Sequence, residues 1–154
     1  MKRNVWMAFL LAPFLFAACG KTNTECVPAT VASEKAAMVA YCTANNISYT
    51  EHSSGILYEI MSPGLGTQPA LTNTVSTVYT GKLLNGTQFD ASANPVSFLL
   101  SGVIKGWQIG IPLIKKGGRI KMVIPSSLAY GCNGSGSIAP NSPLYFEVTL
   151  TDVR

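Results

Sequence analysis

The stretch VSTVYTGKLLNGTQFD, residues 75–90, decides the fold because it encodes two strands and the tight turn between them. Every second residue from Val75 to Leu83 falls on one face, which is the period of a β-strand. Asn85-Gly86 follows, and this pair is the strongest short-range hairpin signal because both turn residues must accept positive φ. The next three residues then return along the first strand. The sequence therefore predicts a β-hairpin.

Four further runs alternate between apolar and polar residues and are predicted as strands, at residues 56–60, 96–100, 119–124 and 144–150. Between the second and third runs the period lengthens. Ile104, Trp107, Ile111 and Ile114 lie three or four residues apart, which predicts a short helix with one apolar face. Pro112 removes a backbone hydrogen bond, so this helix should be brief or bent near its end.

Together these elements predict a fold of the α+β class. About five strands, mostly antiparallel, should form a curled sheet, or half-barrel, over the one short helix, because Trp107 and its neighbours need cover. An additional N-terminal helix is predicted over residues 30–45. There Val31, Ala36 and Val39 belong to a 3–4 spacing, and Asn45-Asn46 supplies a stop.

Composition excludes several classes of function. Of the 154 residues, 47% are hydrophobic and 12% are charged, against about 25% charged in an ordinary soluble domain, so a disordered chain is excluded. The net charge of +4 includes no basic stripe of the kind that nucleic-acid binders carry. One histidine and seven scattered acids offer little for a metal cage, a histidine-based triad or paired catalytic carboxylates. We therefore expect no nucleic-acid partner, no metal and no cofactor.

Residues 1–18 are predicted to be an export signal. The first four residues carry two positive charges, and residues 5–16 form an apolar run that is shorter than the about 20 residues needed to span a bilayer. The following Ala17-Ala18-Cys19-Gly20 resembles the end of a bacterial lipoprotein signal, in which the cysteine becomes the acylated first residue. With Gly20 after the cysteine, the segment resembles the lipoprotein signals of proteins that are sent to the outer membrane. Ordinary signal-peptidase cleavage after Ala18 or nearby is the alternative.

Export would place Cys26, Cys42 and Cys132 in an oxidising compartment, where disulfides persist. Cys42 lies near the end of the predicted N-terminal helix, and residues 26–32 could run back along that helix. We therefore expect a Cys26–Cys42 disulfide, with Cys132 unpaired in a loop rich in glycine and serine. The alternative is that all three cysteines are small apolar filler.

Four segments carry the functional signal: VYTG (78–81) with NGTQFD (85–90), VIKGW (103–107), IPSSLAYG (124–131), and IAPN (138–141) with LYFEV (144–148). In this order and spacing they closely resemble the FKBP-type peptidyl-prolyl isomerases. The resemblance covers residues 75–153, and the strand at 55–61 belongs with it. It divides the chain into the signal (1–18), an anchor or linker with a short helix (19–51) and an isomerase domain (52–154).

The resemblance implies a half-barrel whose concave side holds a proline ring. Trp107 would be the floor of this pocket, and its walls would be Tyr79, Phe89, Val96, Val103, Ile104, Tyr130 and Phe146. The backbone N–H of Ile104 and the hydroxyl of Tyr130 would hold carbonyl groups of the substrate. Asp90 would accept a hydrogen bond from Tyr79 and face the carbonyl of the rotating bond. Ile138 would lie on the loop that covers the pocket.

The implied activity is peptidyl-prolyl cis-trans isomerisation of exported, proline-containing polypeptides by a membrane-anchored monomer of the bacterial envelope. Macrolides of the tacrolimus type would compete for the pocket. Two departures favour an alternative, an FKBP-fold chaperone or peptide-binding module with little turnover. Val96 stands where a second phenylalanine is common, and residues 91–95 contain no arginine to pair with Asp90.

Acylation of Cys19 is the testable consequence of the signal. Mass spectrometry of the membrane fraction should find a mature N-terminal cysteine that carries acyl chains. Each buried CH₂ adds about 0.8 kcal/mol to membrane binding, and more than one chain makes anchoring stable. Recovery of soluble protein that begins at an unmodified residue would refute lipidation.

Overall fold

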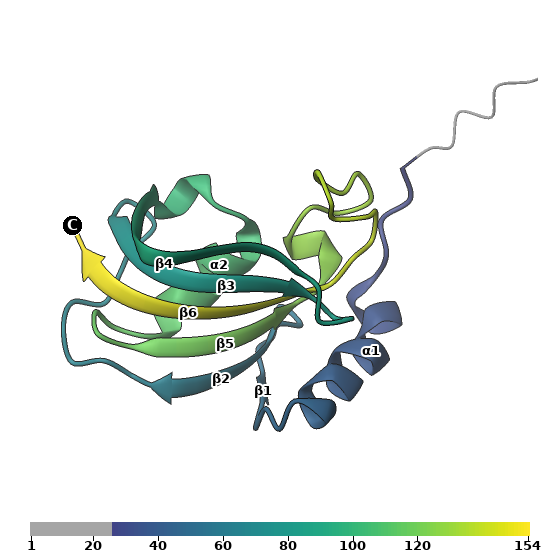
Figure 1. Cartoon of the computed structure of the whole chain (residues 1–154), viewed down its shortest axis with the longest axis horizontal. Coiled ribbons are helices and arrows are strands. Elements are labelled where there is room, and N and C mark those ends of the chain that lie inside the picture. The colour runs from purple at the N-terminus through teal and green to yellow at the C-terminus, as the bar shows by residue number, and fades with distance from the viewer. Residues whose placement is uncertain (1–25) are drawn as a thin grey trace, which may run out of the picture.

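The computed structural model describes residues 26–154, which form two α-helices and one set of strands (Figure 1). In chain order they are α1 (Val31–Ala44), β1 (Thr50–Glu51), β2 (Leu57–Ser62), β3 (Thr74–Leu83), β4 (Gln88–Leu99), α2 (Lys105–Gly110), β5 (Arg119–Ile124) and β6 (Leu144–Val153). Three short 3₁₀ turns join them: η1 (Leu100–Gly102), η2 (Ile111–Leu113) and η3 (Ser126–Leu128).

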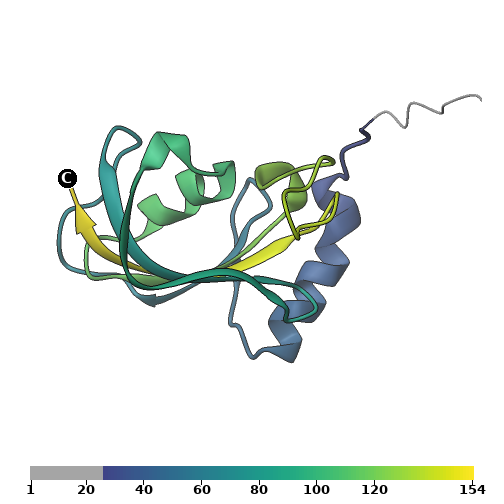
Figure 2. The same ribbon diagram turned by 45° about the horizontal axis from the view of Figure 1, so that its top comes forward.

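The strands form a single antiparallel sheet with the order β1-β2-β5-β6-β3-β4. The sheet curls, and α2 lies on its concave side (Figure 2). The predicted α+β half-barrel over a short helix is thus confirmed. The sheet has six strands rather than about five, because the two-residue β1 pairs with β2 at one edge.

The β3–β4 hairpin forms as predicted, with Gly86 in its turn at a φ of 89°. The returning strand is longer than expected, because residues 88–99 are one strand rather than two separate runs. The register shifts along this strand: Thr77 pairs with Val96, but Tyr79 pairs with Ser92. The extra residues of β4 between these pairs form a bulge, which bends the strand locally.

The main core fills the space between the concave face and α2. Trp107 and Ile111 project from the helical segment against Ile120, Met122 and Val148 of the sheet, and all five are buried. Gly106 permits this close approach, since a Cβ there would collide with the Ile124 side chain of β5. The brief predicted helix is confirmed, because α2 ends at Gly110 and Pro112 falls in the 3₁₀ turn that follows.

A second, smaller core joins α1 to the convex face of the sheet. Met38 and Cys42 of the helix pack with Leu57, Val123 and Tyr145 of three strands. The helix begins after Thr30, whose side chain accepts a hydrogen bond from the N–H of Ser33, and ends before Asn45, close to the predicted bounds. Burial raises the pKa of the Cys42 thiol to about 11, so this cysteine stays protonated in the core.

The predicted Cys26–Cys42 disulfide is wrong, because Cys26 is bonded to Cys132 and Cys42 is free and buried. The Cα atoms of the bonded pair are 5.4 Å apart. The physical reason lies in the helix rise of about 1.5 Å per residue, which carries Cys42 about 17 Å beyond the start of α1. Residues 26–30 do not run back along the helix; they lie beside the loop that carries Cys132.

The predicted export signal and Cys19 lie outside the described residues. Within residues 26–154, no helix is long and apolar enough to cross a membrane.

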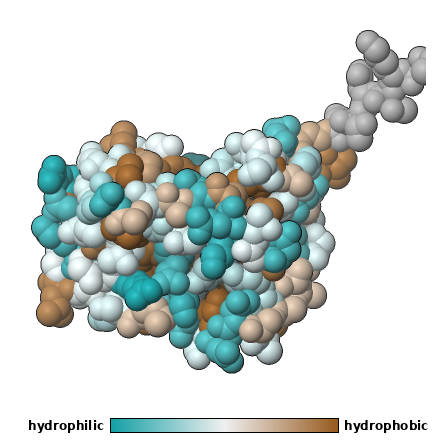
Figure 3. All heavy atoms as spheres, viewed as in Figure 1, coloured by the Kyte–Doolittle hydropathy of each residue, from teal (hydrophilic) through white to brown (hydrophobic). Residues whose placement is uncertain are grey.

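On the face seen in Figure 1, polar residues separate the apolar ones, so no single apolar patch dominates that face (Figure 3). The predicted division at residues 51 and 52 stays a prediction.

The Cys26–Cys132 disulfide leads to a prediction about stability. Peptide mapping without reduction should join these two cysteines and leave Cys42 as a thiol. Cys132→Ser should lower the free energy of unfolding by about 2–4 kcal/mol, because the cross-link spans 106 residues and restricts the unfolded chain. Cys26→Ser should have the same effect, and the double variant should be no less stable than either single one. A bridge that contains Cys42 would contradict this pairing.

Candidate functional site

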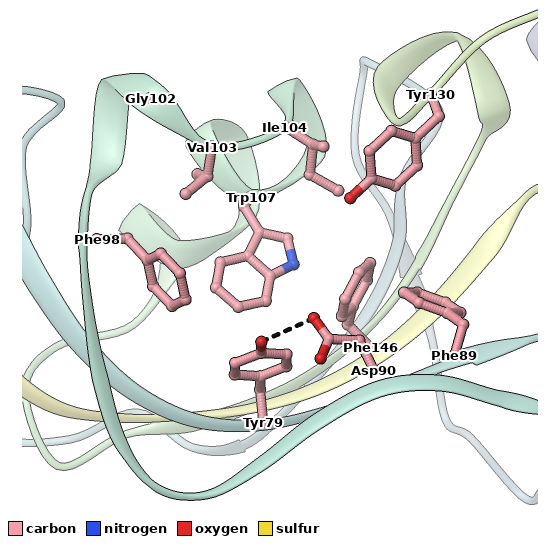
Figure 4. A pocket seen from close by; sticks show the side chains of 10 residues that line it. All are labelled: Tyr79, Phe89, Asp90, Phe98, Gly102, Val103, Ile104, Trp107, Tyr130 and Phe146. Atoms are coloured by element: carbon pink, nitrogen blue, oxygen red, sulfur yellow. Dashed lines mark hydrogen bonds between the residues drawn. The ribbon is translucent and has the colours of Figure 1, made fainter. Parts of the chain in front are cut away.

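A cavity of about 320 Å³ opens on the concave side of the sheet, next to α2 (Figure 4). Strands β3, β4 and β6, helix α2 with the residues before it, and the loop after η3 all contribute to its walls. The lining residues are Tyr79, Phe89, Asp90, Phe98, Gly102, Val103, Ile104, Trp107, Tyr130 and Phe146. Nearly all of them are apolar or aromatic, so the cavity favours an apolar group over water.

Trp107 forms the centre of this cavity and is only 4% exposed. Its ring meets three other rings edge to face, with centroid distances of 5.2 Å to Tyr79, 5.9 Å to Phe98 and 5.3 Å to Phe146. Each such pair contributes about 0.5–1.5 kcal/mol of stabilising free energy beyond that from burial of the rings. The four rings come from α2 and three strands, so their packing fixes the helix against the curled sheet.

Phe89 closes the cavity beside Phe146, with ring centroids 5.5 Å apart. Gly81 of β3 makes room for both rings. A Cβ at this position would lie 2.7 Å from Cζ of Phe89 and 2.8 Å from Cε1 of Phe146, closer than side-chain atoms tolerate. The glycine is therefore required by the two aromatic walls and not by the strand itself.

Tyr79 and Asp90 form the one hydrogen bond between side chains that line the cavity. The Tyr79 hydroxyl donates to Oδ2 of Asp90 at 2.8 Å, and both atoms face the interior (Figure 4). Burial, followed by this bond to a carboxylate, raises the pKa of Tyr79 to about 12. The tyrosine therefore remains a donor at any physiological pH and orients the carboxylate. No ion pair among residues 26–154 involves Asp90.

Two further donors stand at the open side of the cavity. The Tyr130 hydroxyl points into it near Ile104 (Figure 4), and Tyr130 is 37% exposed. Ile104 is the N-cap of α2, so its own N–H lies outside the hydrogen-bond ladder of the helix. A third donor, Nε1 of Trp107, is buried without a hydrogen-bond partner within the described chain.

The structure brings together eight of the residues that the sequence assigned to the site: Tyr79, Phe89, Asp90, Val103, Ile104, Trp107, Tyr130 and Phe146. The prediction that Val96 forms a wall of the cavity is wrong, because Val96 is 38% exposed and does not line the cavity. Phe98 takes that wall instead. Ile138 is buried in the main core and does not line the cavity, and its place on a loop that covers the cavity stays a prediction.

Sequence reasoning missed Phe98 and Gly102 as lining residues. The sequence pattern could have indicated Phe98, since it lies two residues after Val96 in the same alternating run and so falls on the same face of the strand. No such pattern indicated Gly102. Within residues 26–154, no group of three or more histidine, cysteine, aspartate or glutamate side chains is placed to hold a metal ion.

The family of FKBP-type peptidyl-prolyl cis-trans isomerases has a sequence model that matches residues 66–151. These residues make up more than half of the chain and include every residue that lines the cavity. The chain therefore belongs to this family.

Curated relatives agree with the family match. The chain is 48% identical over 105 residues to the FKBP-type peptidyl-prolyl cis-trans isomerase FkpA of Escherichia coli K12. It is 51% identical over 105 residues to a probable FKBP-type isomerase of Haemophilus influenzae. Each match covers 66% of this chain, but only 39% of the first relative and 44% of the second. The chain thus spans well under half the length of these relatives.

Solved structures agree as well. The crystal structure of FkpA from Escherichia coli matches with a TM-score of 0.72 at 41% identity, over 80% of this chain and 61% of that one. A peptidyl-prolyl isomerase from Pseudomonas syringae matches with a TM-score of 0.69 at 33% identity, over 82% of this chain and 98% of that one.

Proposed function

We propose that this chain is a peptidyl-prolyl cis-trans isomerase that accelerates rotation about X–Pro bonds in polypeptides. The observation that carries the proposal is the aromatic cavity around Trp107. Its floor and walls are rings packed edge to face, and its few polar groups are the bonded Tyr79–Asp90 pair, the donors at the rim and Nε1 of Trp107 in the floor. Such a site fits a proline ring and leaves the adjacent carbonyl groups near the donors.

Isomerisation of a peptide bond needs neither a nucleophile nor a proton donor of special pKa. Rotation faces a barrier of about 18–20 kcal/mol because resonance keeps the amide planar, and the unassisted X–Pro reaction takes about 10–100 s. The planar amide is polar, and the twisted amide is less so. An apolar cavity shaped for the twisted form therefore binds the transition state better than the ground state.

The polar groups have separate roles in this proposal. The N–H of Ile104 and the hydroxyl of Tyr130 hold carbonyl oxygens of the substrate and fix the peptide on each side of the proline. The Tyr79 hydroxyl orients Asp90, whose carboxylate faces the carbonyl of the rotating bond. The direction of this carbonyl changes as the amide twists. A carboxylate in a fixed position therefore interacts differently with the planar and the twisted amide.

The alternative, a peptide-binding module with little turnover, loses one of the two features that favoured it. Val96 is not the wall residue, and Phe98 supplies a full aromatic ring there. Asp90 has no cationic partner among the described residues, but the Tyr79 hydroxyl holds it in place. The aromatic wall at Phe98 and the hydrogen-bonded Asp90 are therefore both compatible with the proposed isomerase activity.

The proposal extends to ligands and location. Macrolides of the tacrolimus type should compete with peptides for the cavity, as its resemblance to the family implies. We also propose that the protein works outside the cytoplasm, anchored through Cys19 to the bacterial envelope. The Cys26–Cys132 disulfide supports an oxidising compartment. The signal-like residues 1–18 support export.

Variants that open or trim the cavity test the mechanism. Phe89→Ala should lower kcat/KM on a proline tetrapeptide by more than about ten-fold, because water then enters the apolar cavity. Trp107→Ala should cost at least as much. Tyr130→Phe removes one donor and should cost about 0.5–1.5 kcal/mol, or about two- to twelve-fold. A protease-coupled assay measures all three, and circular dichroism verifies the fold of each variant.

The same assay across pH provides the control. Histidine is the side chain that ordinarily changes charge between about pH 5 and 8, and His52, the only one in the chain, does not line the cavity. The profile of kcat/KM from about pH 6 to 8 should therefore be flat. A bell-shaped profile that disappears in His52→Ala, or a folded Trp107→Ala variant with undiminished activity, would contradict the mechanism.

A further inference from the structure

We infer that Glu34, on the N-terminal helix, is a positioning residue for Tyr130 and hence for the substrate-binding loop. The inference rests on the proposed function for its effect on catalysis. Glu34 lies outside residues 66–151, which match the family, and lines no part of the aromatic cavity. Its link to the site is a chain of hydrogen bonds through Ser126.

Glu34 is the only charged residue among residues 26–154 that is buried, with 7% exposure. One carboxylate oxygen accepts the backbone N–H of Ser126 at 2.8 Å, and the other accepts the Ser126 hydroxyl at 2.5 Å. Burying a carboxylate is costly unless its oxygens are hydrogen-bonded. Both partners here belong to one residue, 92 positions away in the sequence, so the carboxylate is committed to Ser126.

Ser126 passes this restraint to both sides of Tyr130. Its carbonyl oxygen accepts the N–H of Ala129 at 2.9 Å and the N–H of Gly131 at 2.8 Å. These are the residues immediately before and after Tyr130. Glu34 therefore fixes the N–H and the hydroxyl of Ser126. The Ser126 carbonyl oxygen in turn holds the residues on either side of Tyr130, whose hydroxyl points into the cavity (Figure 4).

The segment before α1 holds the same loop a second time. The side chain of Asn141 accepts the N–H of Ala29 at 2.9 Å and donates to the carbonyl of Val27 at 3.0 Å. The backbone N–H of Asn141 in turn donates to the carbonyl of Gly131 at 2.9 Å. The Cys26–Cys132 disulfide lies next to this contact. Residues 26–34 thus contact the loop at Ser126, Cys132 and Asn141.

The location of Glu34 makes a carboxylate suitable for this task. It lies in the first turn of α1, where the helix dipole favours negative charge. Hydrogen bonds to an ionised acceptor are also stronger than those between neutral groups. An apolar residue could fill the same space but could not determine the orientation of the Ser126 peptide, which the Tyr130 turn requires.

Three variants separate positioning from general stability. Glu34→Ala removes both acceptors and should lower kcat/KM about five-fold, the effect of losing an ordinary hydrogen bond. Glu34→Gln should keep most of the activity, because its amide oxygen accepts the Ser126 N–H and its NH₂ donates to the Ser126 hydroxyl oxygen. Lys35→Ala is the matched control. Lys35 lies on the same helix as Glu34, and its replacement removes an exposed ion pair with Glu51 of β1 and should leave activity unchanged.

A double-mutant cycle shows whether Glu34 acts through Tyr130. If it does, Glu34→Ala should lower kcat/KM much less in a Tyr130→Phe background than in the wild-type chain. Ser126→Ala, which keeps the N–H bond and removes the hydroxyl, is the milder variant to use if Glu34→Ala fails to fold. A folded Glu34→Ala variant with wild-type kcat/KM, or with a full additive loss on top of Tyr130→Phe, would overturn the inference.

Amide hydrogen exchange supplies a readout that does not depend on activity. The N–H groups of Ala129 and Gly131 should exchange at least about ten-fold faster in Glu34→Ala than in the wild type, but not in Lys35→Ala, because local opening governs exchange. A wild-type chain without isomerase activity would refute the proposed function and leave this measurement to decide the positioning. Unchanged exchange in Glu34→Ala would refute the positioning itself.

Discussion

The edge-to-face packing of Trp107 against Tyr79, Phe98 and Phe146 is the interaction on which the rest of this structure depends. Helix α2 has only six residues, and helices this short have little stability of their own in water. Burial of the indole ring holds the helix in the curl of the sheet. The same ring is the floor of the cavity, so the residue that stabilises the fold also creates the site.

The N-terminal residues extend this arrangement beyond the family domain. Helix α1 packs on the convex face, opposite the cavity, yet its first turn and the residues before it bind the loop that carries Tyr130. The aromatic floor and walls come from α2 and the curled sheet. One side of the rim, in contrast, is held by residues outside the family domain. A rigid rim matters for an enzyme that acts by shape, because a small displacement of a donor weakens transition-state binding.

Much of the fold could be predicted from local patterns. Alternation located the strands, Asn85-Gly86 located the hairpin, and the spacing around Trp107 located α2. The disulfide could not be predicted this way, because Cys26 and Cys132 meet only after the sheet and α1 have both formed. The wall beside Trp107 was assigned to Val96 instead of Phe98 for a related reason. Val96 and Phe98 alternate onto one face, and the register of a bulged strand decides which one reaches Trp107. Glu34 gave no sequence signal, since a glutamate in the first turn of a helix is ordinarily a solvent-exposed charge.

The central claim is that the Trp107 cavity binds an X–Pro bond and speeds its rotation. NMR exchange spectroscopy of a proline peptide, with the protein at a catalytic concentration, measures both steps in one sample. We expect exchange peaks between the cis and trans forms on a timescale far shorter than the about 10–100 s of the free peptide, and we expect these peaks to be lost when Phe89 is replaced by alanine. Peptide binding at Trp107 without such exchange would contradict the claim.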